Sequence, residues 1–177
     1  MSKDKNIASI SRNGALAAAG LTAMAGVTLG AFLVAPALAT PGSGFAPQAL
    51  STGLFAPMDL KADKAGKWDL MLKTKDSTII GVDKLTVAGG GQSGWHTHTG
   101  VTLVTITAGS VKWTDGSNCG TTIYQAGDTF VEPANRVHLV RNASSSDTAE
   151  FIAIQMRPEG TGARIDAVAP VNNCDLS

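Results

Sequence analysis

The chain is poor in the residue types that most often carry chemistry. Its 177 residues include three histidines, two cysteines and one tyrosine, and only 16% are charged. The 14 lysines and arginines balance the 14 aspartates and glutamates, and no basic stretch or charge block interrupts that balance. Nucleic acid is therefore not an expected partner, because binding to a phosphate backbone requires concentrated positive charge. With so few candidate ligands, the positions of the histidines decide most of the functional interpretation.

The first 39 residues differ from the rest of the chain. Three basic residues precede an uncharged run over 14–35, and Ala37-Leu38-Ala39 offers the small residues that signal peptidases accept. We interpret 1–39 as a signal peptide, which predicts a secreted or periplasmic protein. The alternatives are an uncleaved membrane anchor, since about 20 apolar residues can span a bilayer, and a core helix. A membrane contact is expected only through this segment.

The predicted mature chain is mildly acidic and carries both cysteines. Removal of 1–39 takes away three cations and one anion, which leaves 11 basic against 13 acidic residues. Outside the cytoplasm, Cys119 and Cys174 are expected to form a disulfide that ties the C-terminal tail to a loop. Two free thiols are the alternative. A cysteine metal site is disfavoured, because neither residue has a second cysteine at ligand spacing.

The remainder predicts a linker followed by one all-β domain. Residues 40–57 are rich in Pro, Gly, Ser and Ala and are interpreted as a linker or loosely packed arm. After them, β-branched and aromatic runs alternate with turn residues. The predicted strands are 68–73, 78–88, 101–108, 110–113, 121–124, 128–132, 136–140 and 150–156, with a hairpin turn at Asp115-Gly116. No helical periodicity of about 12 residues follows the first segment, so a single barrel or sandwich is expected over 58–177.

The histidines are spaced as two groups. His96 and His98 would project from one face of a single strand, because alternate side chains of a strand share a face. This pair alone is weak evidence, since two exposed histidines would have the same spacing. His138 follows a predicted turn at Ala134 and Asn135, and asparagine tolerates the positive φ that such a turn needs. The three imidazoles would converge if both strands line one barrel.

The spacing of these residues resembles the two motifs of the cupin superfamily. The first motif, G-x(5)-H-x-H-x(3,4)-E-x(6)-G, aligns with Gly90, His96, His98, Thr102 and Gly109. The second, G-x(5)-P-x-G-x(2)-H-x(3)-N, aligns with Gly127, Pro133, Asn135, His138 and Asn142. Threonine stands where the glutamate ligand is expected, and asparagine replaces the turn glycine. The resemblance covers about 68–157 and implies a cupin-type β-barrel, also called a double-stranded β-helix or jelly roll. The stretches GWHTHTG, VEPANRVHLVRN and ARID…NC are similar to small exported single-domain cupins.

The resemblance implies a divalent metal ion bound by His96, His98 and His138. Imidazole suits Fe, Mn, Zn, Ni and Cu, so the ligands do not name the ion. With Thr102 in place of the glutamate, three neutral imidazoles leave the full +2 charge and at least one open position. That ligand set resembles the three-histidine cupin dioxygenases that hold Fe(II), and it counts against oxalate-decarboxylase-like chemistry. The alternative is a metal-free barrel that keeps the spacing as scaffold.

Three polar residues near the motifs are weaker candidates for a role around the metal. Thr102 is interpreted mainly as barrel filling, with coordination or contact to a metal-bound water as the alternative. Glu132 is interpreted mainly as a solvated carboxylate at a strand end, with a general base or replacement ligand as the alternative. Gln155 could reach the pocket from the last predicted strand. Trp95 should point away from the imidazole of its neighbour and pack.

Three functions remain open from the sequence. The first is an extracytoplasmic metalloenzyme, most simply an Fe(II)-dependent dioxygenase of a small molecule. The second is a barrel that captures a small ligand or a metal without turnover, which the missing glutamate favours. The third is an envelope-associated structural or interaction domain, tethered by 40–57. A homodimer is compatible with each of them, because cupins often pair.

Overall fold

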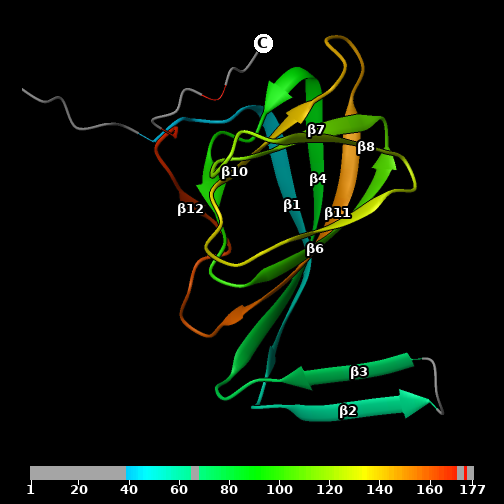
Figure 1. The fold of residues 1–177 in the computed structure, drawn as a ribbon, viewed down its shortest axis with the longest axis vertical. Helices are drawn as coiled ribbons and strands as arrows, with labels where there is room; N and C mark the ends of the chain where they lie inside the picture. Colours follow the sequence, from blue (N-terminus) through cyan, green and yellow to red (C-terminus); the bar gives the residue numbers. More distant parts are fainter. Residues whose placement is uncertain (1–38, 65–67, 171–173, 175–177) are drawn as a thin grey trace, which may run out of the picture. The chain divides into compact units, whose positions relative to one another are not determined.

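The structure is a computed structural model that describes residues 39–64, 68–170 and 174. Apart from Ala39, the predicted signal peptide lies outside the described residues. The described part of the chain consists of strands and their connections (Figure 1). It contains no helix long and apolar enough to cross a membrane.

The described strands follow the predicted ones closely from Trp68 onward. Their bounds are β1 (Ser43–Phe55), β2 (Asp59–Lys64), β3 (Trp68–Lys73), β4 (Thr78–Gln92), β5 (His96–Thr97), β6 (Val101–Ala108), β7 (Ser110–Asp115), β8 (Thr121–Gln125), β9 (Thr129–Glu132), β10 (His138–Asn142), β11 (Ala149–Pro158) and β12 (Ile165–Asp166). β7 and β8 pair antiparallel around the predicted hairpin turn.

One sheet of ten strands makes the barrel, and β2 pairs with β3 in a separate hairpin. The long strand β4 pairs with β1 along one edge and with β11 along the other. Beyond β11 the sheet continues through β6 to β9. On the other side β10 pairs with β4, β5 and β7, which brings the two histidine-bearing segments together. This all-β, cupin-type barrel confirms the predicted fold class.

The barrel interior is filled by the alternate residues of its strands. On β6, Thr102, Val104 and Ile106 are buried while the residues between them are exposed, as expected for a strand with one face in the core. The main core cluster consists of Leu85, Val87, Val104, Ile106, Val111, Val140, Ala149, Phe151 and Ala153. The inward-facing position of Thr102 therefore follows directly from strand periodicity.

The predicted linker is wrong, because most of 40–57 is strand β1. β1 pairs with β4 in an antiparallel register that runs from Ser43 opposite Gln92 to Phe55 opposite Thr78, and Figure 1 shows the two strands side by side. Most β1 side chains are exposed. The strand is held largely by main-chain pairing to the free edge of β4, which requires no apolar pattern. Its small and polar composition therefore gave no strand signal.

A second apolar cluster lies outside the main core and includes the disulfide. Trp95, Leu139 and Cys174 are buried in it, and Cys119 packs against them. Trp95 thus packs, as predicted, while the adjacent His96 belongs to the histidine group. Cys119 and Cys174 are disulfide-bonded across 55 residues of sequence. The cross-link anchors the C-terminal tail beside the segments that carry His96 and His138.

Removal of the disulfide should cost a large share of the stability of the domain. In the chain-entropy model, a closed loop of 55 residues stabilises the folded state by about 4 kcal/mol. We expect the Cys119→Ser, Cys174→Ser double variant to unfold at a correspondingly lower denaturant concentration. Reduction of the wild type should reproduce this loss, whereas reduction of the variant should change nothing. An unchanged midpoint in the variant would contradict the prediction.

Candidate metal centre

The three histidines converge in the structure. His96 on β5 is the cross-strand neighbour of His138 on β10, and His98 follows directly after β5. The centroids of the rings of His96 and His138 are 4.3 Å apart, and that of His98 lies 5.0 and 5.1 Å from the other two. All three side chains are buried, and their ligand nitrogens lie within 4.8 Å of one another. The group has the composition and the spacing of a metal site.

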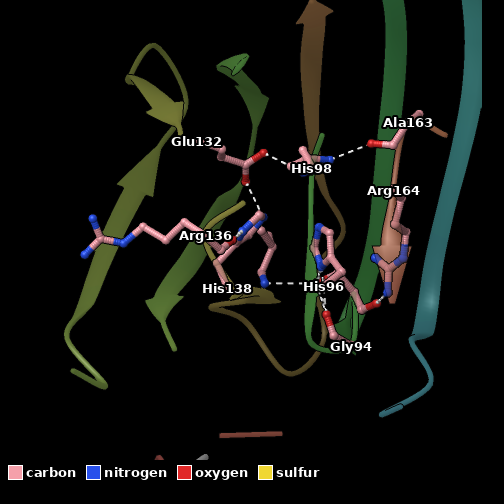
Figure 2. Close-up of polar contacts among 10 residues, drawn as sticks. Gly94, His96, His98, Glu132, Arg136, His138, Ala163 and Arg164 are labelled. Atoms are coloured by element: carbon pink, nitrogen blue, oxygen red, sulfur yellow. Dashed lines mark hydrogen bonds and ion pairs between the residues drawn. The ribbon is translucent and has the colours of Figure 1, made fainter. Parts of the chain in front are cut away.

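Each imidazole is oriented by a backbone carbonyl group. The Nδ1 atoms of His96, His98 and His138 lie 2.9, 2.7 and 2.9 Å from the carbonyl oxygens of Gly94, Ala163 and Arg136, respectively (Figure 2). A carbonyl oxygen can only accept a hydrogen bond, so Nδ1 carries the proton in each ring. A neutral ring in this tautomer presents the lone pair of Nε2, as a metal-binding histidine must.

Local backbone geometry explains two of these orientations. Gly94 has a φ of +72°, a conformation open to glycine, and a Cβ atom there would overlap the carbonyl oxygen of Thr40. The tight turn directs the Gly94 carbonyl group toward the ring of His96. Asn135 has a φ of +60°, as its place in the predicted turn required. Its N–H donates to the carbonyl oxygen of His98 at 2.8 Å, which ties the second motif to the first.

Glu132 corrects the main sequence interpretation of that residue. Its side chain was expected to be solvated, but it is only 4% exposed. Its Oε2 lies 3.1 Å from Nε2 of His98, and its Oε1 lies 3.1 Å from Nε2 of His138 (Figure 2). Sequence reasoning judged the residue by its place at a strand end. Alternation along β9 turns its side chain inward, directly opposite the buried Thr102 on β6.

Thr102 and Gln155 lie in the same row of the sheet as Glu132. Thr102 on β6 is directly opposite Glu132 on β9 and opposite Gln155 on β11. The Thr102 side chain is 1% exposed, and its Oγ1 has no hydrogen-bond partner among the described residues. All three residues line the same pocket as His96 and His98. The structure thus gathers the three weaker candidates around the histidines.

The C-terminal segment contributes two site residues that motif spacing missed. Ala163 supplies the carbonyl oxygen that holds His98. Arg164 lines the pocket, donates through Nη2 to the carbonyl oxygen of Ser93 at 2.7 Å, and pairs with Asp166. The only sequence signal for them was the ARID stretch, which resembled other exported cupins but carried no ligand pattern.

His96 and His98 open onto a cavity of about 210 Å³. Its apolar wall is formed by Phe45, Leu85, Val140, Phe151 and Ala153, and its polar residues include Asp83, Gln155 and Arg164. A cavity of this size accommodates a small molecule beside the imidazoles and excludes a folded polymer. An apolar wall with a few polar groups is the usual composition of a small-molecule site.

Burial and mutual contact shift the pKa values of the site. Burial, together with the positive charges that His138 and Arg164 can carry, lowers the pKa of His96 to about 3. Burial also opposes the charged form of His98, but its contacts with Glu132 outweigh this and raise the pKa of His98. For Glu132, burial favours the protonated form, yet the two imidazoles hold its pKa below the usual range. The protein therefore keeps His96 neutral and Glu132 ionised.

The metal-free protein should lose stability on mild acidification because of His96. Unfolded His96 binds a proton below its ordinary pKa of 6.5, whereas in the folded protein its pKa is about 3. The lowered pKa of Glu132 stabilises the folded protein, and this stabilisation is lost only below pH 4.5, the pKa of the unfolded group. The raised pKa of His98 also stabilises the folded protein, and this stabilisation is complete below pH 6.5. Between about pH 6 and 4.5, His96 should therefore lower the unfolding free energy by about 1.4 kcal/mol per pH unit, and the raised pKa of Asp83 acts in the opposite direction and reduces the net fall.

Chemical unfolding of chelator-treated protein at several pH values measures this slope. His96→Gln is the matched control, because glutamine keeps a polar side chain but takes up no proton. In that variant, we expect the slope of the unfolding free energy between about pH 6 and 4.5 to be smaller by about 1.4 kcal/mol per pH unit, which corresponds to one proton. An equal slope in both proteins would show that His96 is not the group responsible.

Comparison with known proteins agrees with the architecture of the site. Residues 84–155, which contain all three histidines, match the family model for the cupin domain. No curated protein matches the chain in sequence. A cupin-like protein from Thermotoga maritima is 21% identical over 51% of this chain and 65% of its own, with a TM-score of 0.45. A cupin-2 domain from Rhodospirillum rubrum is 15% identical over 74% of each chain, with a TM-score of 0.48.

An oxalate decarboxylase from Lactobacillus farciminis, solved with formate, is also similar. It is 21% identical over 49% of this chain but only 26% of its own, with a TM-score of 0.43. The chain thus spans about a quarter of that enzyme and 65% of the Thermotoga protein. The match over 84–155 identifies a cupin domain in this part of the chain, and the histidine group and the barrel agree with it.

Proposed function

We propose that the protein is an extracytoplasmic metalloprotein that binds a divalent ion through His96, His98 and His138 and admits a small molecule to it. The observation that carries the proposal is the orientation of the rings. Three buried imidazoles with Nδ1 bound to carbonyl oxygens offer their Nε2 atoms to one point. In particular, Nε2 of His98 and of His138 have no hydrogen-bond partner among the described residues. Buried polar atoms are rarely left unpaired, and a metal ion would satisfy them.

The donor set fits a borderline ion better than a hard one. Imidazole nitrogen suits Zn, Fe, Mn, Ni and Cu, whereas Ca²⁺ and Mg²⁺ prefer shells made wholly of oxygen. When bound, such an ion would polarise or activate a small molecule that coordinates it. The chain itself orients the three rings, excludes bulk water by burial and lines the approach with apolar side chains.

The pocket supports turnover of the oxygenase class as the reaction to test first. The imidazoles of His96 and His98, which line the cavity, are arranged as metal ligands. Chemistry at this site would therefore depend on the metal and on a substrate bound beside it, as proposed for an Fe(II)-dependent dioxygenase. Capture of a small ligand without turnover is the alternative, and it requires the same ligands and the same cavity.

Elemental analysis of protein purified without oxygen tests the proposal. We expect about one transition-metal ion per chain, retained through gel filtration. Oxygen uptake by Fe(II)-loaded protein across thiols, diketones and phenols then separates turnover from binding. Stoichiometric iron without uptake would end the dioxygenase proposal and leave a binding protein. Failure to retain any of the five candidate metals after reconstitution would end both.

The location and the assembly of the protein remain proposals. The disulfide between Cys119 and Cys174 supports an oxidising compartment, in agreement with the proposed signal peptide. The intact mass of the exported protein tests this, because cleavage after Ala39 would give a chain that begins at Thr40. The homodimer stays a prediction, as does the absence of a nucleic-acid partner.

A further inference from the structure

We propose that Glu132 is the fourth protein ligand of the metal. The carboxylate of the site then comes from β9, and not from the motif position on β6 that Thr102 occupies. This inference rests on the proposed metal binding by the histidines and deepens it. Glu132 lies in neither ligand position of the two motifs, and its role follows from contacts in the structure.

The contacts between Glu132 and the two neighbouring imidazoles require a cation in the site. The protons of His98 and His138 lie on Nδ1, because both Nδ1 atoms face carbonyl oxygens. Their Nε2 atoms therefore direct lone pairs into a space that also contains both carboxylate oxygens, at 3.1 Å each. Neither Nε2 makes a hydrogen bond of acceptable geometry to the carboxylate. Lone pairs and a carboxylate repel each other at this distance unless a positive ion lies between them.

A divalent ion meets this requirement better than a second proton on each ring. One ion can accept lone pairs from several nitrogens and from a carboxylate oxygen at once. Protons on both Nε2 atoms would instead place two imidazolium charges against the single negative charge of Glu132 in a buried site. The 4% exposure of Glu132 makes the same point, since a buried carboxylate needs a compensating charge.

The sheet register explains how Glu132 can replace the missing ligand. Thr102 and Glu132 are directly opposite each other on the antiparallel strands β6 and β9. Cβ atoms of such a pair are about 4.5–5.5 Å apart and face the same side of the sheet. A glutamate side chain can therefore reach one point in the barrel from either strand. The short Thr102 side chain leaves the space that the Glu132 carboxylate needs.

This assignment changes the charge of the proposed centre. Three neutral imidazoles would leave a divalent ion with its full +2 charge, whereas Glu132 reduces the net charge to +1. The shift of the carboxylate to β9 leaves the small Thr102 side chain in the pocket lining. The structure thus points to a site of three histidines and one glutamate with a rearranged origin of the glutamate.

Zinc affinity, measured by competition with a chromogenic chelator, tests the inference. We expect Glu132→Gln to raise the Kd for Zn²⁺ by about 100-fold, at or above the upper end of the 10- to 100-fold effects of residues that only orient ligands. The double variant T102E/E132T returns the carboxylate to β6 and should recover most of that loss. Glu150→Gln removes a carboxylate that pairs with Lys84 at the surface and should leave the Kd unchanged.

A crystal structure of the zinc-loaded wild type gives an answer that does not depend on any variant folding. A Glu132 oxygen about 2.0–2.2 Å from the ion supports the inference. A Glu132 carboxylate too far from the ion for direct coordination, together with an unchanged Kd in Glu132→Gln, overturns the inference and leaves the three-histidine site intact. If the wild type binds no Zn²⁺, Fe²⁺, Mn²⁺, Ni²⁺ or Cu²⁺, the proposed function itself fails.

Discussion

The double substitution His96→Ala, His98→Ala should reduce the metal content from about one ion per chain to background. It removes two of the three nitrogens that lie within 4.8 Å of one another, and His138 with Glu132 is too small a ligand set to hold an ion at physiological supply. Wild type in metal at a thousand times its Kd gains about 4.1 kcal/mol of stability. We expect this gain to vanish in the variant, as measured by elemental analysis and by unfolding with and without metal.

Two further variants separate loss of the site from loss of the fold. His96→Gln, His98→Gln retains most of the buried volume and should lose the metal while it keeps cooperative unfolding. Thr105→Ala, Thr129→Ala alters an exposed cross-strand pair on β6 and β9 and should keep the metal. Wild-type metal content in either histidine double variant would refute every functional proposal made for this site.

Sequence spacing was sufficient for the fold and for the histidine group. The strands after Trp68 have strong β-branched and aromatic patterns, so their positions followed from side-chain chemistry alone. His96, His98 and His138 were predictable because two rigid motifs fix their backbone positions in a barrel. Their convergence needed no information about side-chain rotamers, since the strands β5 and β10 pair at those residues.

The elements that were missed depend on long-range pairing. β1 is recognisable only once the free edge of β4 exists, because its own side chains are largely exposed. Ala163 acts through its carbonyl oxygen, and a backbone group leaves no trace in residue identity. The environment of Glu132 depends on its register with Thr102, which a reading of one strand at a time cannot supply. Local patterns thus determined the ligands, and strand pairing determined their surroundings.

Asn142→Asp should be among the most destabilising single substitutions in the domain. The buried Asn142 side chain donates through Nδ2 to the carbonyl oxygens of Val87, Ala88 and Asp147 at 2.8, 3.1 and 2.7 Å. Its Oδ1 accepts from the N–H of Ser144 at 2.8 Å. Aspartate has nearly the same shape, but an ionised carboxylate would face three carbonyl oxygens. An unpaired buried charge of this kind costs about 3–5 kcal/mol.

The pH dependence of that loss identifies its cause. Burial against carbonyl oxygens should raise the pKa of the new carboxyl group above its unfolded value of about 3.9. The penalty is therefore largest at neutral pH and shrinks as the pH falls toward that value, where the protonated group can again donate one hydrogen bond. Asn118→Asp, at an exposed loop position where the side chain only accepts, should stay within about 0.5 kcal/mol of wild type. Equal stability of the two variants at neutral pH would contradict the prediction. If Asn142→Asp alone is destabilised, the last residue of the second motif serves to clamp β10, and with it His138, against β4.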